Sequence, residues 1–286
     1  MVLFLFHALV AAHIVTGSIG AIAFWVPVIG RKGGANHARW GKVFTFALLI
    51  TGCLAMVMSL LTLAAPIETH PHLEGRFDEA FIRGIFGWMM LMTGLLTVNL
   101  AWYGWLSIRN KRRHELNRSR LNLFLQYALI PASLNCAWQG WMIGQPLMIG
   151  ICMVGLATAG TNLWFILARE PGPGSWIKEH IKALVGAGIS VYTAFMAFGS
   201  VRIFPELALN PFMWAVPLVV GVSLIIWHRR VVDRQFAGRG RRLSADVVVR
   251  SLLSVPDSNV NRPTKYRTSG AREQFWIGKG SHESHH

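Results

Sequence analysis

Histidines are the residues of this chain that are best placed to do chemistry. An imidazole binds a metal or haem iron through one ring nitrogen, and it exchanges a proton near neutral pH. His37 lies in the basic stretch "RKGGANHARWGK", and His180 lies in "WIKEHIKALVGAG" at the start of a later apolar run. If these stretches meet in the fold, the histidines form a two-His site to which Glu179 or Glu170 would add a ligand. The sequence does not show that they meet, and solvated histidines at a membrane edge are the alternative.

A second pair of histidines lies in "PIETHPHLEGRFDE", which separates two apolar runs. His70 and His72 have Glu68 and Glu74 nearby, and such a set can capture Zn²⁺ or Cu²⁺. A tetrahedral site needs three or four ligands held in place. The alternative is a flexible loop that enforces no such geometry.

His13 lies inside the first apolar run, "MVLFLFHALVAAHIVTG". At the rise of a helix it would lie roughly 15 Å below the membrane surface. An ionisable group at that depth is costly and is a candidate for function. The alternative is a neutral histidine bonded to a neighbouring helix, for which Tyr192 and Asn135 are the expected partners.

The apolar runs that must position these residues define the class of protein. The chain is 53% hydrophobic and only 14% charged, whereas a soluble domain carries about 25% charged residues. Runs of about 20 apolar residues span a bilayer as helices. We therefore predict an all-α membrane protein whose residues 1–229 form seven transmembrane helices, at about 2–29, 43–65, 84–106, 121–143, 146–168, 180–203 and 211–228.

The placement of Lys and Arg predicts the orientation. Together with the span ends beside them, the first, third and fifth connecting loops hold 13 Lys or Arg, and the second, fourth and sixth hold 3. The positive-inside rule then places the N-terminus outside and the C-terminus in the cytoplasm of a multi-pass protein of the bacterial inner membrane. The net charge of +15 is thus explained without nucleic acid.

The remaining residues, 230–286, are strongly basic and low in apolar content. Such a composition predicts a largely disordered cytoplasmic tail. The piece "RRLSADVVVRSLLS" is typical of an interfacial helix, at about 243–254. We expect the seven helices to contact the lipid bilayer, and we expect the basic tail to contact anionic lipids at its surface.

Two stretches carry a resemblance to known proteins. "KGGANHARWGKVF" and "WIKEHIKALVGAGISVYTAF" resemble a group of uncharacterised bacterial polytopic membrane proteins, through Lys32, Gly33, His37, Arg39, Gly41, Trp176, His180 and Thr193–Ala194–Phe195. This resemblance implies an inner-membrane protein and supplies no reaction. A fainter similarity is to membrane cytochromes of the b561 kind, which hold haem between histidines on facing helices. It implies haem b between His37 and His180.

Two functions follow as hypotheses. The first is an integral membrane protein with a transport, sensing or assembly role and no classical catalysis. The chain has no G-x-x-x-x-G-K-[ST], H-E-x-x-H or G-x-S-x-G motif. The sequence therefore gives no indication of a P-loop, of a zinc protease site or of a serine hydrolase. The second is a membrane-embedded haem- or metal-dependent oxidoreductase that uses His37 and His180. Neither substrate nor oligomeric state is predicted.

Overall fold

A computed structural model describes residues 1–199 and 210–253, which form helices and no strand. The long helices are α1 (Val2–Ile29), α2 (Ala35–Ala64), α5 (Met90–Asn110), α6 (Arg120–Met142), α7 (Pro146–Leu167), α8 (Ser175–Ala194) and α9 (Pro211–Leu253). Shorter elements join them: α3 (Pro66–Thr69), η1 (Pro71–Leu73), α4 (Glu79–Ile82), η2 (Arg83–Met89), η3 (His114–Arg118) and η4 (Phe195–Gly199). The prediction of an all-α protein is confirmed.

Six helical segments of the described part are long and apolar enough to cross a membrane. They are Val2–Ile29, Ala35–Ala64, Glu79–Asn110, Pro146–Leu167, Ser175–Gly199 and Phe212–Gly238. The remaining long helix, α6, is more polar because it carries Arg120, Asn122, Gln126, Asn135 and Gln139. The chain is therefore a helical protein with several candidate transmembrane helices.

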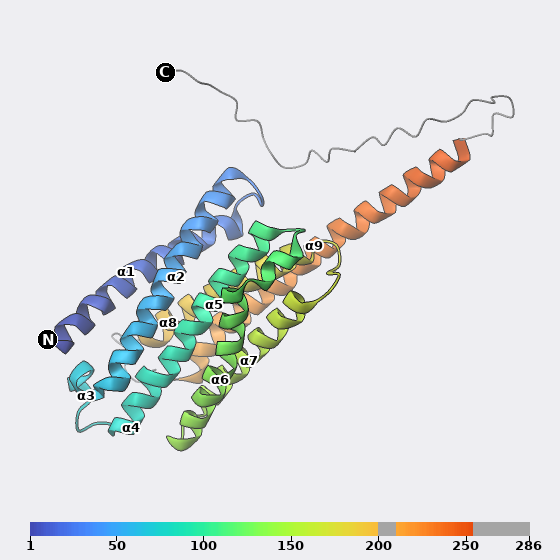
Figure 1. Cartoon of the computed structure of the whole chain (residues 1–286). Coiled ribbons are helices and arrows are strands. Elements are labelled where there is room, and N and C mark those ends of the chain that lie inside the picture. Colours follow the sequence, from blue (N-terminus) through green and yellow to red (C-terminus); the bar gives the residue numbers. More distant parts are fainter. Residues whose placement is uncertain (200–209, 254–286) are drawn as a thin grey trace, which may run out of the picture. The chain divides into compact units, whose positions relative to one another are not determined.

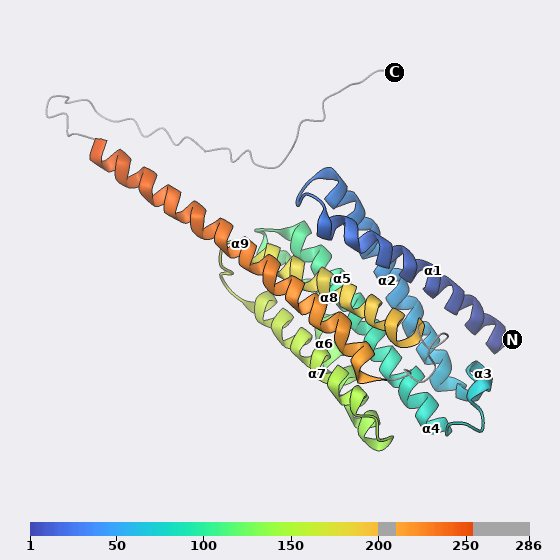
Figure 2. The ribbon, with the colours of Figure 1, turned by 180° about the vertical axis from the view of Figure 1, so that it is seen from behind.

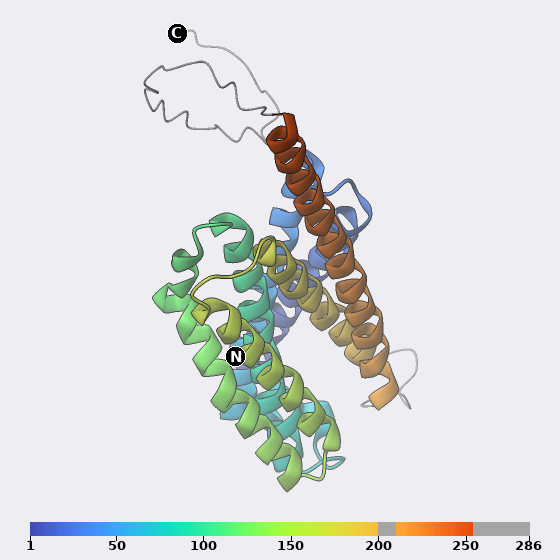
Figure 3. The same ribbon diagram turned by 90° about the vertical axis from the view of Figure 1, so that its right-hand side faces the viewer.

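Helix α5 lies at the centre of the bundle, where it packs against α2, α6 and α8. Figures 1 and 2 show α1 beside α2, and Figure 3 shows α6 and α7 toward one side of the molecule with α8 toward the other. Figure 1 also shows that the α1–α2, α5–α6 and α7–α8 connections gather at one end. The basic loops of the sequence thus share one end of the bundle.

The chain divides into two compact units, Met1–Phe236 and Ala237–His286, and the bundle belongs to the first. The part of the predicted tail from 230 to 253 belongs to α9 and is helical, whereas the sequence predicted disorder with a helix only from 243. The rest of that tail, 254–286, lies outside the described residues. So do residues 200–203 of the predicted sixth span.

Helix α2 begins at Ala35, eight residues before the predicted start of the second span. The connection from α1 is only five residues long, and Gly33 turns it with a φ of 75°, a conformation that glycine adopts without strain. Gly34 then caps the helix. His37 is consequently a helical residue of the first turn of α2, and its position is fixed by the helix.

Candidate functional site

His37 and His180 meet at the end of the bundle that carries the basic loops. Their ring centroids are 6.5 Å apart with an angle of 60° between the ring planes. His37 lies in the first turn of α2, and His180 lies in the second turn of α8. The juxtaposition that the sequence left open is therefore present in the fold, and both rings are half-buried.

The tautomer of both rings follows from their hydrogen bonds. His37 Nδ1 lies 3.2 Å from the Pro27 carbonyl oxygen, and His180 Nδ1 lies 3.0 Å from that of Gly104. A carbonyl oxygen only accepts, so each Nδ1 carries the proton and donates it. The lone pair then belongs to Nε2, and the described residues offer neither Nε2 a hydrogen bond. This is the arrangement that orients a metal-binding imidazole.

The separation of the rings suits one iron or metal ion between them. Two imidazoles that bind one ion through Nε2, at about 2.0–2.1 Å each, have centroids roughly 5 to 6 Å apart, so the 6.5 Å separation leaves room for one ion. Within the described residues no group of three or more His, Cys, Asp or Glu could hold a metal. A zinc or copper site would need such a group, whereas haem brings four ligands and asks the protein for two. The pair therefore fits haem better than a bare ion.

The surroundings of His37 are also compatible with a flat, acidic cofactor. Gly41 follows one turn later on the same face of α2, and a Cβ placed there would meet no heavy atom within 4 Å. Lys32, Arg39 and Lys42 bring positive charge to the same region of sequence. Those charges suit the carboxylates that haem carries.

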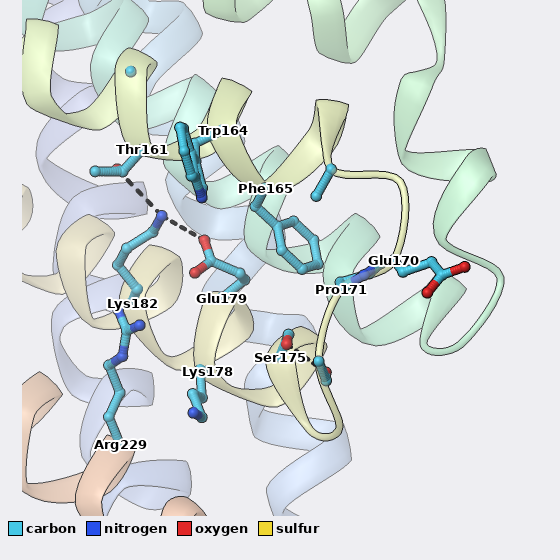
Figure 4. Close-up of a pocket in the computed structure, with 13 residues that line it drawn as sticks. Thr161, Trp164, Phe165, Glu170, Pro171, Ser175, Lys178, Glu179, Lys182 and Arg229 are labelled. Atoms are coloured by element: carbon cyan, nitrogen blue, oxygen red, sulfur yellow. Dashed lines mark hydrogen bonds and ion pairs between the residues drawn. The ribbon is translucent and has the colours of Figure 1, made fainter.

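A charged cluster that the sequence did not reveal lies on the neighbouring face of α8. Glu179 accepts a hydrogen bond from the Tyr103 hydroxyl at 2.8 Å and pairs with Lys182. The Glu179 and Lys182 side chains are only 10% and 17% exposed, and Figure 4 shows Lys182 between Glu179 and Thr161. Tyr103 and Lys182 both contact the same carboxylate oxygen, Glu179 Oε2, so this oxygen belongs to the cluster and is not directed to a metal beside His180.

His13 is bonded to a residue that the sequence did not suggest. Its Nδ1 donates to the Thr51 carbonyl oxygen at 3.1 Å, so α2 supplies the partner. Tyr192 instead accepts from Trp25 Nε1 at 2.6 Å and donates to the Ala21 carbonyl at 2.8 Å. Asn135 is half-buried. The structure thus joins α1 to α2 through His13 and α1 to α8 through Tyr192, in place of the expected contacts with His13.

His70 and His72 do lie together, with ring centroids 6.0 Å apart. His70 is buried, since it packs between Phe6 at 5.1 Å and Phe86 at 4.5 Å and shares a hydrogen bond with Thr69. The described residues bring no third ligand to the pair. The zinc or copper site stays a prediction with two ligands.

The burial of His70 predicts a pH-dependent stability. Burial and, to a lesser extent, the neighbouring His72 lower the pKa of His70 to about 4, against about 6.5 in an unfolded chain. Between these two pKa values the unfolded chain protonates His70 and the folded chain does not. The contribution of His70 to the free energy of unfolding is therefore fully present above about pH 6.5 and is lost as the pH drops toward 4. We expect the melting temperature of the purified protein to fall from pH 7.5 to pH 5. The fall should shrink in His70→Phe, and an identical fall in both proteins would contradict the role of His70.

A row of amides fills the core between α5, α6 and α7. Asn162 Nδ2 donates to Asn99 Oδ1 at 3.3 Å and to Gln126 Oε1 at 3.1 Å, and all three side chains are fully buried. Asn99 Nδ2 and Asn162 Oδ1 have no partner among the described residues. His114, also buried, has neither ring nitrogen bonded, and nothing in the sequence singled it out.

Comparison with known proteins adds no functional assignment to this geometry. No family model matches the chain, and neither a curated protein nor a solved structure does so.

Proposed function

We propose that the chain is a seven-span inner-membrane protein with its N-terminus outside and its basic loops in the cytoplasm. Six spans are the apolar segments, and α6 is the seventh, since its 23 residues are long enough to cross. Its polar residues are tolerated because Asn122 and Gln126 face the protein core, where they are fully buried. The gathering of basic loops at one end supports this topology.

For its function we propose electron transfer through haem b held by His37 and His180 at the cytoplasmic end. The observation that carries this proposal is the pair itself: two imidazoles on different helices, 6.5 Å apart, each with Nδ1 fixed by a main-chain carbonyl. When bound, haem would accept and return single electrons. The fainter similarity to b561-type cytochromes implies the same pair of histidines.

The chain's own part in this function is to hold the two rings. The Pro27 and Gly104 carbonyls fix ring orientation and make each Nε2 more electron-rich, which strengthens it as a ligand. Pro27 belongs to α1 and Gly104 to α5, so the site depends on four helices, because α2 and α8 carry the ligands. A rigid frame of this kind would keep both Nε2 atoms in place for a bound haem.

The visible spectrum of the purified full chain tests this function. We expect a Soret band, a difference spectrum between reduced and oxidised protein, and about one haem per chain, because the chain offers one pair of histidines that would hold a haem. A protein that is colourless after expression with added haem precursor, and that takes up no haem on titration, would contradict the proposal.

The transport, sensing or assembly role stays a prediction. His13, the intramembrane candidate for function, donates from Nδ1 to the Thr51 carbonyl oxygen at 3.1 Å and thus has a partner within the bundle. No observation in the described residues favours that role over electron transfer.

A further inference from the structure

A pocket of about 600 Å³ lies at the same end of the bundle, between α7, the α7–α8 connection, α8 and α9. Figure 4 shows its lining, with Trp164 and Phe165 from α7, Lys182 and Glu179 from α8, and Arg229 from α9. The pocket is distinct from the histidine pair, whose residues do not line it. It combines an aromatic wall with a cationic one.

Three cations face this pocket, and two of them have carboxylate partners. Lys182 pairs with Glu179, and Lys178 pairs with Asp233. Arg229 has no hydrogen-bond or ion-pair partner among the described residues, although it is half-buried. Figure 4 shows it reaching toward Lys182, and shows the carboxylate of Glu170 directed away from both. The cationic wall therefore keeps one unneutralised charge, which favours an anion.

The aromatic wall indicates whether the anion comes from the aqueous solution or from the lipid bilayer. Trp164 is 84% exposed and lies in the last turn of α7, one of the segments apolar enough to cross a membrane. An exposed Trp at a helix end is typical of the level of the lipid headgroups. Gly160 and Thr161, one turn earlier, are exposed as well. The pocket thus opens on the face of α7 that lipid would cover, at headgroup level.

We propose that this pocket binds the phosphate group of an anionic lipid, with Arg229 as its principal ligand and Lys182 beside it. An Arg guanidinium donates two parallel hydrogen bonds to phosphate oxygens. The first turn of α8, where Ser175 lines the pocket, adds the positive end of a 20-residue helix. Basic pockets between membrane helices on the cytoplasmic side are suited to such headgroups.

The test is native mass spectrometry of the full chain in an uncharged detergent, titrated with dioleoyl phosphatidylglycerol. We expect Arg229→Gln to weaken binding of this lipid roughly 10-fold, the loss of one charge-assisted bidentate contact. Arg230→Gln is the matched control, since Arg230 is the next residue of α9, is exposed and does not line the pocket. It should weaken binding far less than Arg229→Gln does, and Arg229→Lys should fall in between.

Two results would overturn the proposal. Equal losses in the Arg229 and Arg230 variants, or no loss in either, would show diffuse attraction to basic residues in place of a pocket. Inorganic phosphate is the second probe, because it shares the chemistry of the headgroup. Arg229-dependent binding of inorganic phosphate without binding of the lipid would refute lipid as the source of the anion.

Discussion

His180→Ala and His37→Ala should each remove at least about nine-tenths of the haem that co-purifies with the chain, since each substitution removes one of the two side chains that would hold the haem. The effect should be the largest of any single substitution, because the two rings are the whole protein contribution to coordination. Haem per chain, measured as its pyridine complex, checks this expectation. Elution of the variants at the wild-type volume would show that the loss is local.

Two other histidines provide matched controls. His13 Nδ1 donates to the Thr51 carbonyl at 3.1 Å, and His228 Nδ1 donates to that of Leu224 at 2.9 Å. Both therefore present the same tautomer as the pair, but the described rings place no second imidazole beside either. His13→Ala and His228→Ala should retain haem. Loss of haem in all four variants alike would contradict the assignment to His37 and His180.

Glu179→Ala should lower the free energy of unfolding by about 3 kcal/mol, the cost of breaking a largely buried ion pair. The substitution strands the Lys182 ammonium, whose side chain is 17% exposed, and deprives the buried Tyr103 hydroxyl of its acceptor. Equilibrium unfolding in mixed detergent micelles measures the loss.

A double substitution tests whether the cost comes from stranding Lys182. Glu179→Gln keeps an acceptor for Tyr103, and Lys182→Met removes the charge together with its partner. The double variant should recover most of the stability, since replacing both members of a buried pair is close to neutral. A double variant as unstable as Glu179→Ala would show that the pair itself stabilises the fold.

The helices were predictable because a long apolar run in lipid has to satisfy its own backbone hydrogen bonds, and a helix does so. The first, fourth and fifth predicted spans differ from α1, α6 and α7 by a residue or less at each end. The start of α2 was not predictable in the same way. The charged stretch "RKGGANHARWGK" is typical of a loop, whereas α2 already begins at Ala35. Charge does not prevent a helix, and the turn needs only the positive φ of Gly33.

The site was predictable in its members but not in its geometry. His37 and His180 stood out as histidines in basic stretches at the same membrane edge, yet only packing of α2 and α8 around α5 brings them to 6.5 Å. The groups that orient the two rings are the main-chain carbonyls of Pro27 and Gly104. Every residue has such a carbonyl, so the residue types in the sequence do not predict these hydrogen bonds. The sequence names Glu179 as a possible ligand but does not reveal its hydrogen bond with Tyr103, because that bond joins positions that are far apart in the sequence.

Electron paramagnetic resonance of the oxidised, purified chain tests most directly whether one iron lies between the two imidazoles. Two strong axial nitrogen ligands give a low-spin ferric iron, and we expect the wild-type spectrum to show this state alone. His37→Ala with residual haem should turn high-spin, and added imidazole should restore the low-spin signal. A high-spin wild type, or a low-spin signal that persists when both histidines are replaced, would contradict the account.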